Sequence, residues 1–113
     1  TPLLDLGYTI IDASLLVDDD GTPYIFYSAN LNMGDHYESI TYGVEMQRDL
    51  SGMAGEPLKL IEATEPWETR TSQRVWAEGG VVQKHDGLYY LQCVFRERLQ
   101  RGRGHGEIAA GAL

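Results

Sequence analysis

The sequence predicts an all-β fold, and three observations lead to this prediction. Short runs rich in β-branched and aromatic residues alternate with turns that contain Asp and Gly. No stretch of the chain has the apolar period of an amphipathic helix. A hairpin pattern also occurs twice, with a spacing of 66 residues. Repeated antiparallel units of this kind are typical of β-propeller blades.

The first half of the chain predicts three strands. Residues 13–17 and 23–29 should pair as a hairpin, because both runs are rich in strand-forming residues and Asp18-Asp19-Asp20-Gly21 between them has the composition of a turn. Residues 30–39 are polar and contain glycine, which predicts a loop. Residues 40–46 alternate between apolar and polar side chains, so we expect a third strand there.

The second half predicts one more strand and a second hairpin. Residues 48–57 are a turn-rich connection, and 58–61 are a short outer strand. Residues 62–73 have no clear period and predict a long loop, of the kind that is often functional. Residues 79–84 and 88–93 then form the second hairpin. These strands complete about two blades of a propeller.

The repeat brings two acidic residues into one position. A shift of 66 residues lays Asp12 on Glu78, Gly21 on Gly87 and Tyr24 on Tyr90. In a propeller the innermost strand of each blade runs along the central axis, so the same end of successive inner strands faces one shared funnel. We therefore expect Asp12 and Glu78 to face each other.

Charge and composition limit the partners. The net charge is -8, and residues 1–95 carry 5 basic and 15 acidic side chains. Such an acidic body is a poor match for nucleic acid, whose phosphates require clustered Lys and Arg. No stretch resembles a membrane span, so no membrane partner is expected. No signal peptide is recognisable and Cys93 is the single cysteine, so the compartment stays open.

The two ends of the chain predict an internal piece of a longer protein. There is no initiator Met, the opening residues already resemble a strand, and the repeat occurs only twice although repeat folds need about three units. Residues 1–92 are expected to be a partial β-propeller domain. Residues 93–113 lose the strand alternation and become basic, which we interpret as an out-of-frame tail; a basic surface segment or a disordered terminus is the alternative.

Several motifs occur in order over residues 3–92. They are Ile11-Asp12-Ala13-Ser14, Asp18-Asp19-Asp20-Gly21, Tyr24-Ile25-Phe26-Tyr27, Tyr42-Gly43-Val44-Glu45, Gly55-Glu56-Pro57, Trp76-Ala77-Glu78-Gly79 and Lys84-His85-Asp86-Gly87-Leu88-Tyr89-Tyr90-Leu91. In this order they resemble glycosyl hydrolases family 43. The resemblance implies a five-bladed β-propeller, of which residues 1–92 would be a partial catalytic domain. No cofactor is expected. It also implies inverting hydrolysis of α-L-arabinofuranosides or β-D-xylosides in plant polysaccharides, with an oligo- or polysaccharide as the partner.

The resemblance also implies roles for the two carboxylates. In this family one Asp is the general base, a second Asp modulates the pKa of the acid and positions it, and a Glu is the general acid. Asp12 matches the second Asp, and Glu78 matches the acid. The base lies one blade earlier, and only eleven residues precede Asp12, so we expect the base to be missing from this chain. The family commonly has Pro where this chain has Gly80.

Physical chemistry is compatible with these roles. Inverting hydrolysis requires a protonated and an ionised carboxyl about 6.5–9.5 Å apart. A negative charge on Asp12 and partial burial would each raise the pKa of Glu78, which keeps its proton available. The simpler alternatives are that Glu78 is a turn residue and Asp12 a strand-end cap.

The remaining candidates are aromatic or metal-binding residues. Trp67 and Trp76 could stack on sugar rings, and a core position for Trp76 is an equal alternative. Asp18-Asp19-Asp20-Gly21 lacks the later acid of a calcium loop, so it predicts a turn. His36 and His85 lack partners at ligand spacing, so no metal site is expected.

Two other functions fit the same residues. The first is a non-catalytic β-propeller that binds glycan or protein through the funnel. The second is a related five-bladed hydrolase that retains configuration by means of an Asp nucleophile. An Asp at the start of a preceding inner strand would favour an enzyme, and the stereochemistry of the product would separate inversion from retention.

Overall fold

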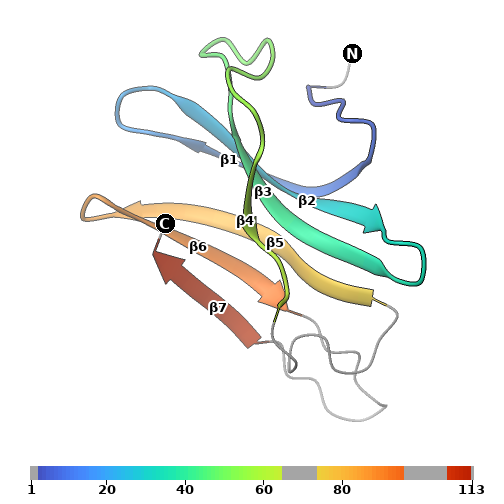
Figure 1. The fold of residues 1–113 in the computed structure, drawn as a ribbon. Helices are drawn as coiled ribbons and strands as arrows, with labels where there is room; N and C mark the ends of the chain where they lie inside the picture. The colour runs from blue at the N-terminus through green and yellow to red at the C-terminus, as the bar shows by residue number, and fades with distance from the viewer. Residues whose placement is uncertain (1–2, 65–73, 96–106, 113) are drawn as a thin grey trace.

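The computed structural model describes residues 3–64, 74–95 and 107–112, and every regular element in this part of the chain is a strand (Figure 1). The strands are β1 (Thr9–Val17), β2 (Pro23–Asn32), β3 (Tyr37–Glu45), β4 (Leu58–Ile61), β5 (Arg74–His85), β6 (Leu88–Phe95) and β7 (Glu107–Ala112). The prediction of an all-β chain is confirmed. The described segments contain no helix that could cross a membrane.

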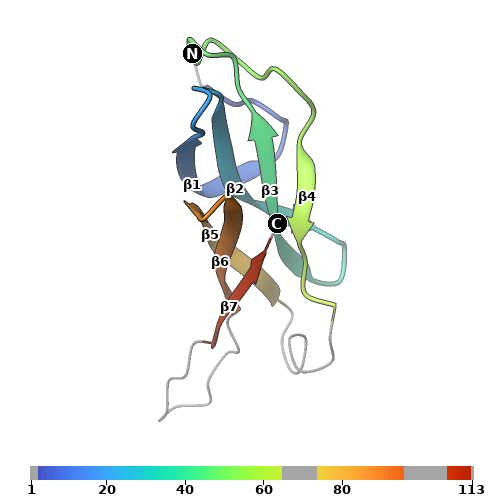
Figure 2. The ribbon, with the colours of Figure 1, turned by 90° about the vertical axis from the view of Figure 1, so that its left-hand side faces the viewer.

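The strands form two antiparallel units. In the first unit β1, β2, β3 and β4 pair in chain order, and they stand side by side in Figure 2. In the second unit β5 pairs with β6, and β6 pairs with β7. A short parallel pairing of β3 with β5, from Tyr37 opposite Arg74 to Ser39 opposite Trp76, joins the two units. Because of this pairing, β5 lies against the first unit, and residues of both units contribute to the site described below.

The predicted boundaries hold for some strands and not for others. The short outer strand β4 (Leu58–Ile61) lies where the sequence predicts it. The predicted loop over residues 30–39 is wrong for most of its length, because β2 continues to Asn32 and β3 begins at Tyr37. Residues 30–32 pair in register with residues 37–39. Backbone pairing does not require apolar side chains, so the polar composition of this segment concealed the longer hairpin.

The end of the chain contributes to the second unit. β6 continues to Phe95, and β7 pairs along it from Phe95 opposite Glu107 to Tyr90 opposite Ala112. This pairing does not bear on the reading frame of the gene, so the division at residue 92 and the out-of-frame interpretation stay predictions.

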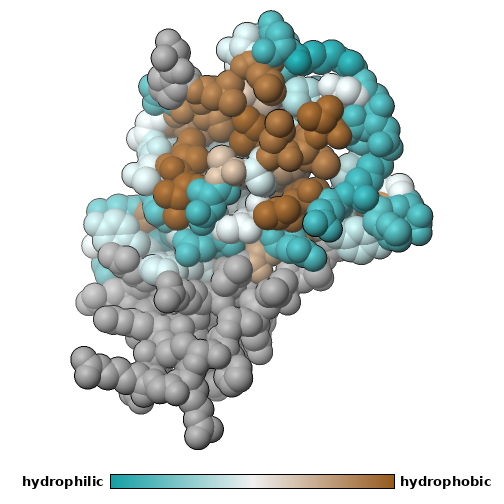
Figure 3. Space-filling model, turned by 180° about the vertical axis from the view of Figure 1, so that it is seen from behind, coloured by the Kyte–Doolittle hydropathy of each residue, from teal (hydrophilic) through white to brown (hydrophobic). Residues whose placement is uncertain are grey.

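The core occupies both faces of β2. Alternate residues Ile25, Tyr27 and Ala29 pack on one face with Val44 of β3 and with Met46, which follows the end of β3. On the other face Phe26 packs with two residues of the second unit, Val82 and Leu91. A strand alternates its side chains between faces, so β2 is the layer that both clusters share. Figure 3 shows apolar side chains gathered over the first unit on its rear face.

Candidate active site

Glu78 lies at a β-bulge in β5. Glu78 is paired with Val94 and Val81 with Gln92, so two residues of β5 stand opposite one residue of β6. Gly79 in this bulge has a φ of 68°, a left-handed conformation that glycine adopts without a steric penalty. The bulge therefore redirects the chain immediately after the carboxylate.

β1 contains the equivalent bulge, with Asp12 inside it. The register of β1 against β2 shifts between Ile11 and Ser14, and Asp12 has a φ of 52°. Within its own hairpin Asp12 therefore corresponds to Gly79, which is also left-handed, and not to Glu78. When the two hairpins are aligned by their bulges, the prediction that the two carboxylates occupy one position of the repeat is therefore wrong by one residue. The difference arises because the loop of the first hairpin is longer than that of the second.

Between the two units, however, β1 and β5 are matched at an offset of 66 residues. The Ser14 hydroxyl donates to the Gly80 carbonyl at 2.8 Å, and Lys84 Nζ lies 2.6 Å from Asp18 Oδ1. Both contacts join residues that are 66 apart in sequence. The same offset relates Asp12 to Glu78. Lys84 Nζ also lies 2.7 Å from Asp19 Oδ2, at an offset of 65 residues, so these side-chain contacts place β1 and the turn after it beside β5 close to the spacing of the repeat.

Hydroxyl groups of the first unit contact four consecutive residues of β5. Two hydroxyls donate to backbone carbonyls, one accepts from a backbone N–H, and one contacts the Glu78 carboxyl. The pairs are Thr41 Oγ1 with Ala77 O (2.8 Å), Ser39 Oγ with Glu78 Oε2 (3.3 Å), Ser28 Oγ with Gly79 N (3.2 Å) and Ser14 Oγ with Gly80 O (2.8 Å). We call these four side chains the hydroxyl row. The row fixes the backbone on both sides of Glu78.

Burial differs between the two carboxylates. Glu78 is partly buried, next to Ala77, which is completely buried. Asp12 is exposed on β1. The hydroxyl that contacts Glu78 belongs to a buried serine, since Ser39 is only 3% exposed. Glu78 is therefore held against protein, whereas Asp12 faces solvent.

The two tryptophans have different outcomes. Trp76 is partly buried at the start of β5, opposite Ser39 of β3. Partial burial is compatible both with stacking on a sugar and with a place at the edge of the core, so its role as a substrate-binding residue stays a prediction. Trp67 lies outside the described residues.

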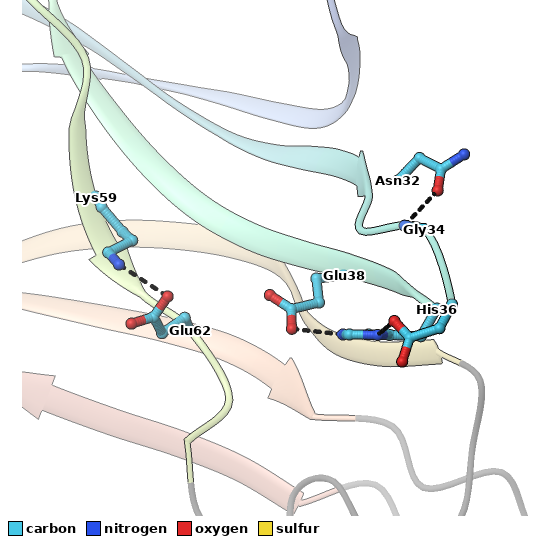
Figure 4. Close-up of polar contacts among 7 residues, drawn as sticks. Asn32, Gly34, His36, Glu38, Lys59 and Glu62 are labelled. Carbon is cyan, nitrogen blue, oxygen red and sulfur yellow. Dashed lines mark hydrogen bonds and ion pairs between the residues drawn. The ribbon is translucent and has the colours of Figure 1, made fainter.

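The histidine and aspartate candidates form ion pairs. Both ring nitrogens of His36 face carboxylates, with Nδ1 2.5 Å from Asp35 and Nε2 2.8 Å from Glu38 (Figure 4). The hydrogen bond with Glu38 and then that with Asp35 raise the pKa of His36. Asp18 contacts Lys84 and Tyr89, and these bonds lower the pKa of Asp18 to about 2. Across the described residues no cluster of three or more His, Cys, Asp or Glu could hold a metal.

The hydroxyl row escaped the sequence prediction. Ser39 and Thr41 lie two residues apart on β3, so they share a face, and Ser28 is buried within β2. Buried hydroxyls inside strands that otherwise bury apolar residues are a weak signal that something polar packs against them. The partner could not be identified without the packing of β5.

The fold and the site indicate a β-propeller domain with carboxylates at its inner strands. β1 and β5 are these strands, and each has a carboxylate at a bulge. The comparisons agree, because the model of glycosyl hydrolases family 43 matches residues 1–100, and the chain belongs to this family. No curated protein matches the chain. The prediction of the family is confirmed.

Three solved structures share the fold. A thermostable family-43 glycoside hydrolase is 36% identical, with a TM-score of 0.76 over 84% of this chain and 31% of that chain. An endo-1,4-beta-xylanase from Bacteroides thetaiotaomicron VPI-5482 is 26% identical, with a TM-score of 0.73 over 99% of this chain and 35% of its own. An endo-arabinase from the same organism shares the fold at 18% identity, with a TM-score of 0.71 over 99% of this chain and 40% of its own.

This chain therefore spans between 31% and 40% of the length of these structures. Its units correspond to blades of the five-bladed β-propeller of the family, which confirms the predicted fold.

Proposed function

We propose that this chain is the acid-bearing part of an inverting glycoside hydrolase that acts on arabinofuranosyl or xylosyl linkages of plant cell-wall polysaccharides. Glu78 is the general acid, and Asp12 modulates its pKa. One observation carries the assignment. The contacts with β5 made by Ser14 of β1 and by Asp18 in the turn after β1 share the 66-residue offset that relates Asp12 to Glu78. This offset supports placing both carboxylates at one level of the funnel.

The chemistry follows from this pair. Glu78 donates a proton to the glycosidic oxygen as the bond to the sugar breaks, and an ionised carboxylate across the ring removes a proton from the attacking water. A negative charge on Asp12 disfavours ionised Glu78, as does the partial burial of Glu78. The base is proposed to lie outside this chain, in the remainder of the propeller.

The similar structures support a pentose-containing substrate. The xylanase is 26% identical to this chain, which favours xylosyl linkages. The endo-arabinase is more distant and supports the fold alone. Both arabinofuranosyl and xylosyl substrates therefore belong in the test.

We expect Glu78→Gln to abolish most activity in a protein made from the complete reading frame that contains this chain. General acids contribute about 10²- to 10⁴-fold in rate, and we expect a loss of this size on arabino- and xylo-oligosaccharides. Nitrophenyl glycosides should lose less, because nitrophenolate leaves without a proton. Initial rates on both substrate types give this comparison. Glu45→Gln, which removes an exposed carboxylate at the end of β3, is the matched control.

Several results would contradict the proposal. Equal losses on both substrate types would show that Glu78 does not act as the acid. Retention of configuration in the first-formed product, measured by proton NMR, would exclude inversion. Glycan binding by the wild-type protein without any hydrolysis would instead support the non-catalytic propeller.

A further inference from the structure

The buried hydroxyl of Ser39 lies between the proposed acid and an amide. Ser39 Oγ is 3.3 Å from Glu78 Oε2 and 2.5 Å from Asn30 Oδ1, and Ser39 pairs directly with Asn30 across β2 and β3. The three polar groups therefore form a chain that begins on β2, crosses β3 and ends on β5. At 3% exposure, Ser39 leaves little room for water to replace its hydroxyl.

A count of protons shows which protonation state of Glu78 these three hydrogen-bonded groups favour. A serine hydroxyl has one proton to donate, and an amide oxygen can only accept. The proton of Ser39 belongs to its shorter contact, with Asn30 Oδ1. The contact between Ser39 Oγ and Glu78 Oε2 then needs a proton from the carboxyl, because two lone pairs would otherwise face each other. A protonated Glu78 completes the chain by donating to Ser39, and an ionised Glu78 does not.

We propose that Ser39, oriented by Asn30, is a positioning residue that accepts a hydrogen bond from protonated Glu78 and so holds its acidic proton. This inference rests on the proposed role of Glu78 as the general acid. In this proposal two residues raise the pKa of Glu78: Asp12 acts through its charge, and Ser39 acts through a hydrogen bond.

The surroundings keep Ser39 in place. Thr41, two residues along the same face of β3, donates to the Ala77 carbonyl, and Ser28 of β2 accepts from the Gly79 N–H. The backbone on each side of Glu78 is therefore tied to the strands that carry Ser39 and Asn30.

Glu38, adjacent to Ser39 on β3, points to the opposite face and pairs with His36. Asp12 of β1 is the carboxylate that the inter-strand offset relates to Glu78.

The test is the pKa of Glu78, measured by ¹³C NMR of the side-chain carboxyl in the purified chain and assigned with Glu78→Gln. We expect Ser39→Ala to lower this pKa by about half to one unit, because the protonated form loses its acceptor. Asn30→Ala should shift it in the same direction, since the freed Ser39 proton can turn to ionised Glu78. Ser39→Thr keeps a hydroxyl and should restore most of the wild-type value.

Ser28→Ala is the matched control. It removes a buried hydroxyl of the same row that binds backbone and not the carboxyl, and it should leave the pKa of Glu78 within about 0.2 units. A rise in this pKa in Ser39→Ala would show that Ser39 donates to ionised Glu78, and it would overturn the proposal, as would no change. If Ser39→Ala does not fold, the direction in which Asn30→Ala shifts the pKa of Glu78 tests the proposal instead: a lower pKa supports it, and a higher or unchanged pKa overturns it. The titration needs no turnover, so it can fail independently of the proposed function.

Discussion

Asp12 combines a proposed chemical role with a backbone constraint. Its φ of 52° is unusual for a residue with a side chain, but Asp and Asn adopt this conformation more readily than other residues. In the bulge of β5, Gly79 has the corresponding left-handed conformation, and the carboxylate of Glu78 lies one residue earlier. Asp at position 12 thus suits the local backbone, which explains why an acid can interrupt an otherwise apolar strand.

Gly80 is required for a different reason, which is close packing. A Cβ atom at this position would lie 2.8 Å from Thr41 Cγ2 and 3.4 Å from Leu91 Cδ1. The methyl group of Thr41 therefore occupies the space into which a side chain at residue 80 would project. This chain combines glycine at residue 80 with threonine at residue 41.

We expect Gly80→Ala to destabilise the chain by about 1–3 kcal/mol, because the new methyl overpacks the contact with Thr41. Thr41→Ser removes the obstructing methyl and keeps the hydroxyl that donates to Ala77. The double variant should therefore be more stable than the sum of the single changes predicts, by about 1 kcal/mol or more. Urea unfolding of the four proteins measures this coupling. Additivity within about 0.5 kcal/mol would show that Thr41 does not restrict residue 80.

The two hairpins are joined at one end by a cluster of charged groups. Lys84 Nζ lies 2.6 Å from Asp18 and 2.7 Å from Asp19, Tyr89 donates to Asp18, and Lys84 stands 5.1 Å from the centre of the Tyr89 ring. The bond from Lys84, then that from Tyr89, holds the pKa of Asp18 at about 2, and Asp18 in turn raises the pKa of Lys84. This cluster connects the turn after β1 to the strands β5 and β6.

The cluster predicts a pH dependence of stability. The pKa of Asp18 is lower in the folded chain, about 2, than its ordinary value of 3.8. Its contribution to the free energy of unfolding is therefore fully present above about pH 4 and is lost as the pH falls toward 2. We expect Asp18→Asn to be less stable than wild type at pH 5, and the difference to shrink between pH 4 and pH 2. Urea unfolding at several pH values provides the measurement.

Asp86→Asn is the control for this pH series. Asp86 is 86% exposed in the turn between β5 and β6, and Asn also tolerates its φ of 48°. Its effect on the free energy of unfolding should be small at every pH. A difference between wild type and Asp18→Asn that stays constant from pH 5 to pH 2 would exclude the ion pair as its source.

The strands themselves were largely predictable, whereas their lengths were not. The Asp-rich turn after β1, the Asp86-Gly87 turn and the short strand β4 follow from composition, because turn residues and β-branched runs act locally. The extension of β2 and β3 through Asn30–Asn32 and Tyr37–Ser39 depends on pairing between two polar segments. Such pairing leaves no pattern in the side chains of either segment alone.

The whole chain holds one half of the proposed chemistry. Its two units are joined by the hydroxyl row, by the cluster at Lys84 and by apolar contacts of Phe26 with Val82 and Leu91. These contacts support a defined orientation of β5 against the first unit, and hence of Glu78. The matched structures extend well beyond the length of this chain, which is where we propose the general base to lie.

We expect the 113-residue chain alone to hydrolyse no measurable nitrophenyl α-L-arabinofuranoside or nitrophenyl β-D-xyloside, because the base that activates water is proposed to lie outside it. A protein from the complete reading frame should hydrolyse at least one of them. Release of nitrophenolate, followed by absorbance, compares the two. Circular dichroism of the short chain serves as the control for folding. Turnover by the folded short chain at a rate that disappears in Glu78→Gln would show that the base is present within it.

The sequence by itself determined the all-β class, the repeated hairpins and the order of motifs that places the chain in glycosyl hydrolases family 43, because these depend on local chemistry and residue order. Only the tertiary structure decided that Asp12 is in the left-handed position of its bulge, and that the hydroxyls of Ser14, Ser28, Ser39 and Thr41 contact residues 77–80 of β5. Ser39 and Glu78 are 39 residues apart, and their contact arises where β5 packs against the first unit. Side-chain contacts between distant strands depend on the angle and register of that packing, which no single segment encodes.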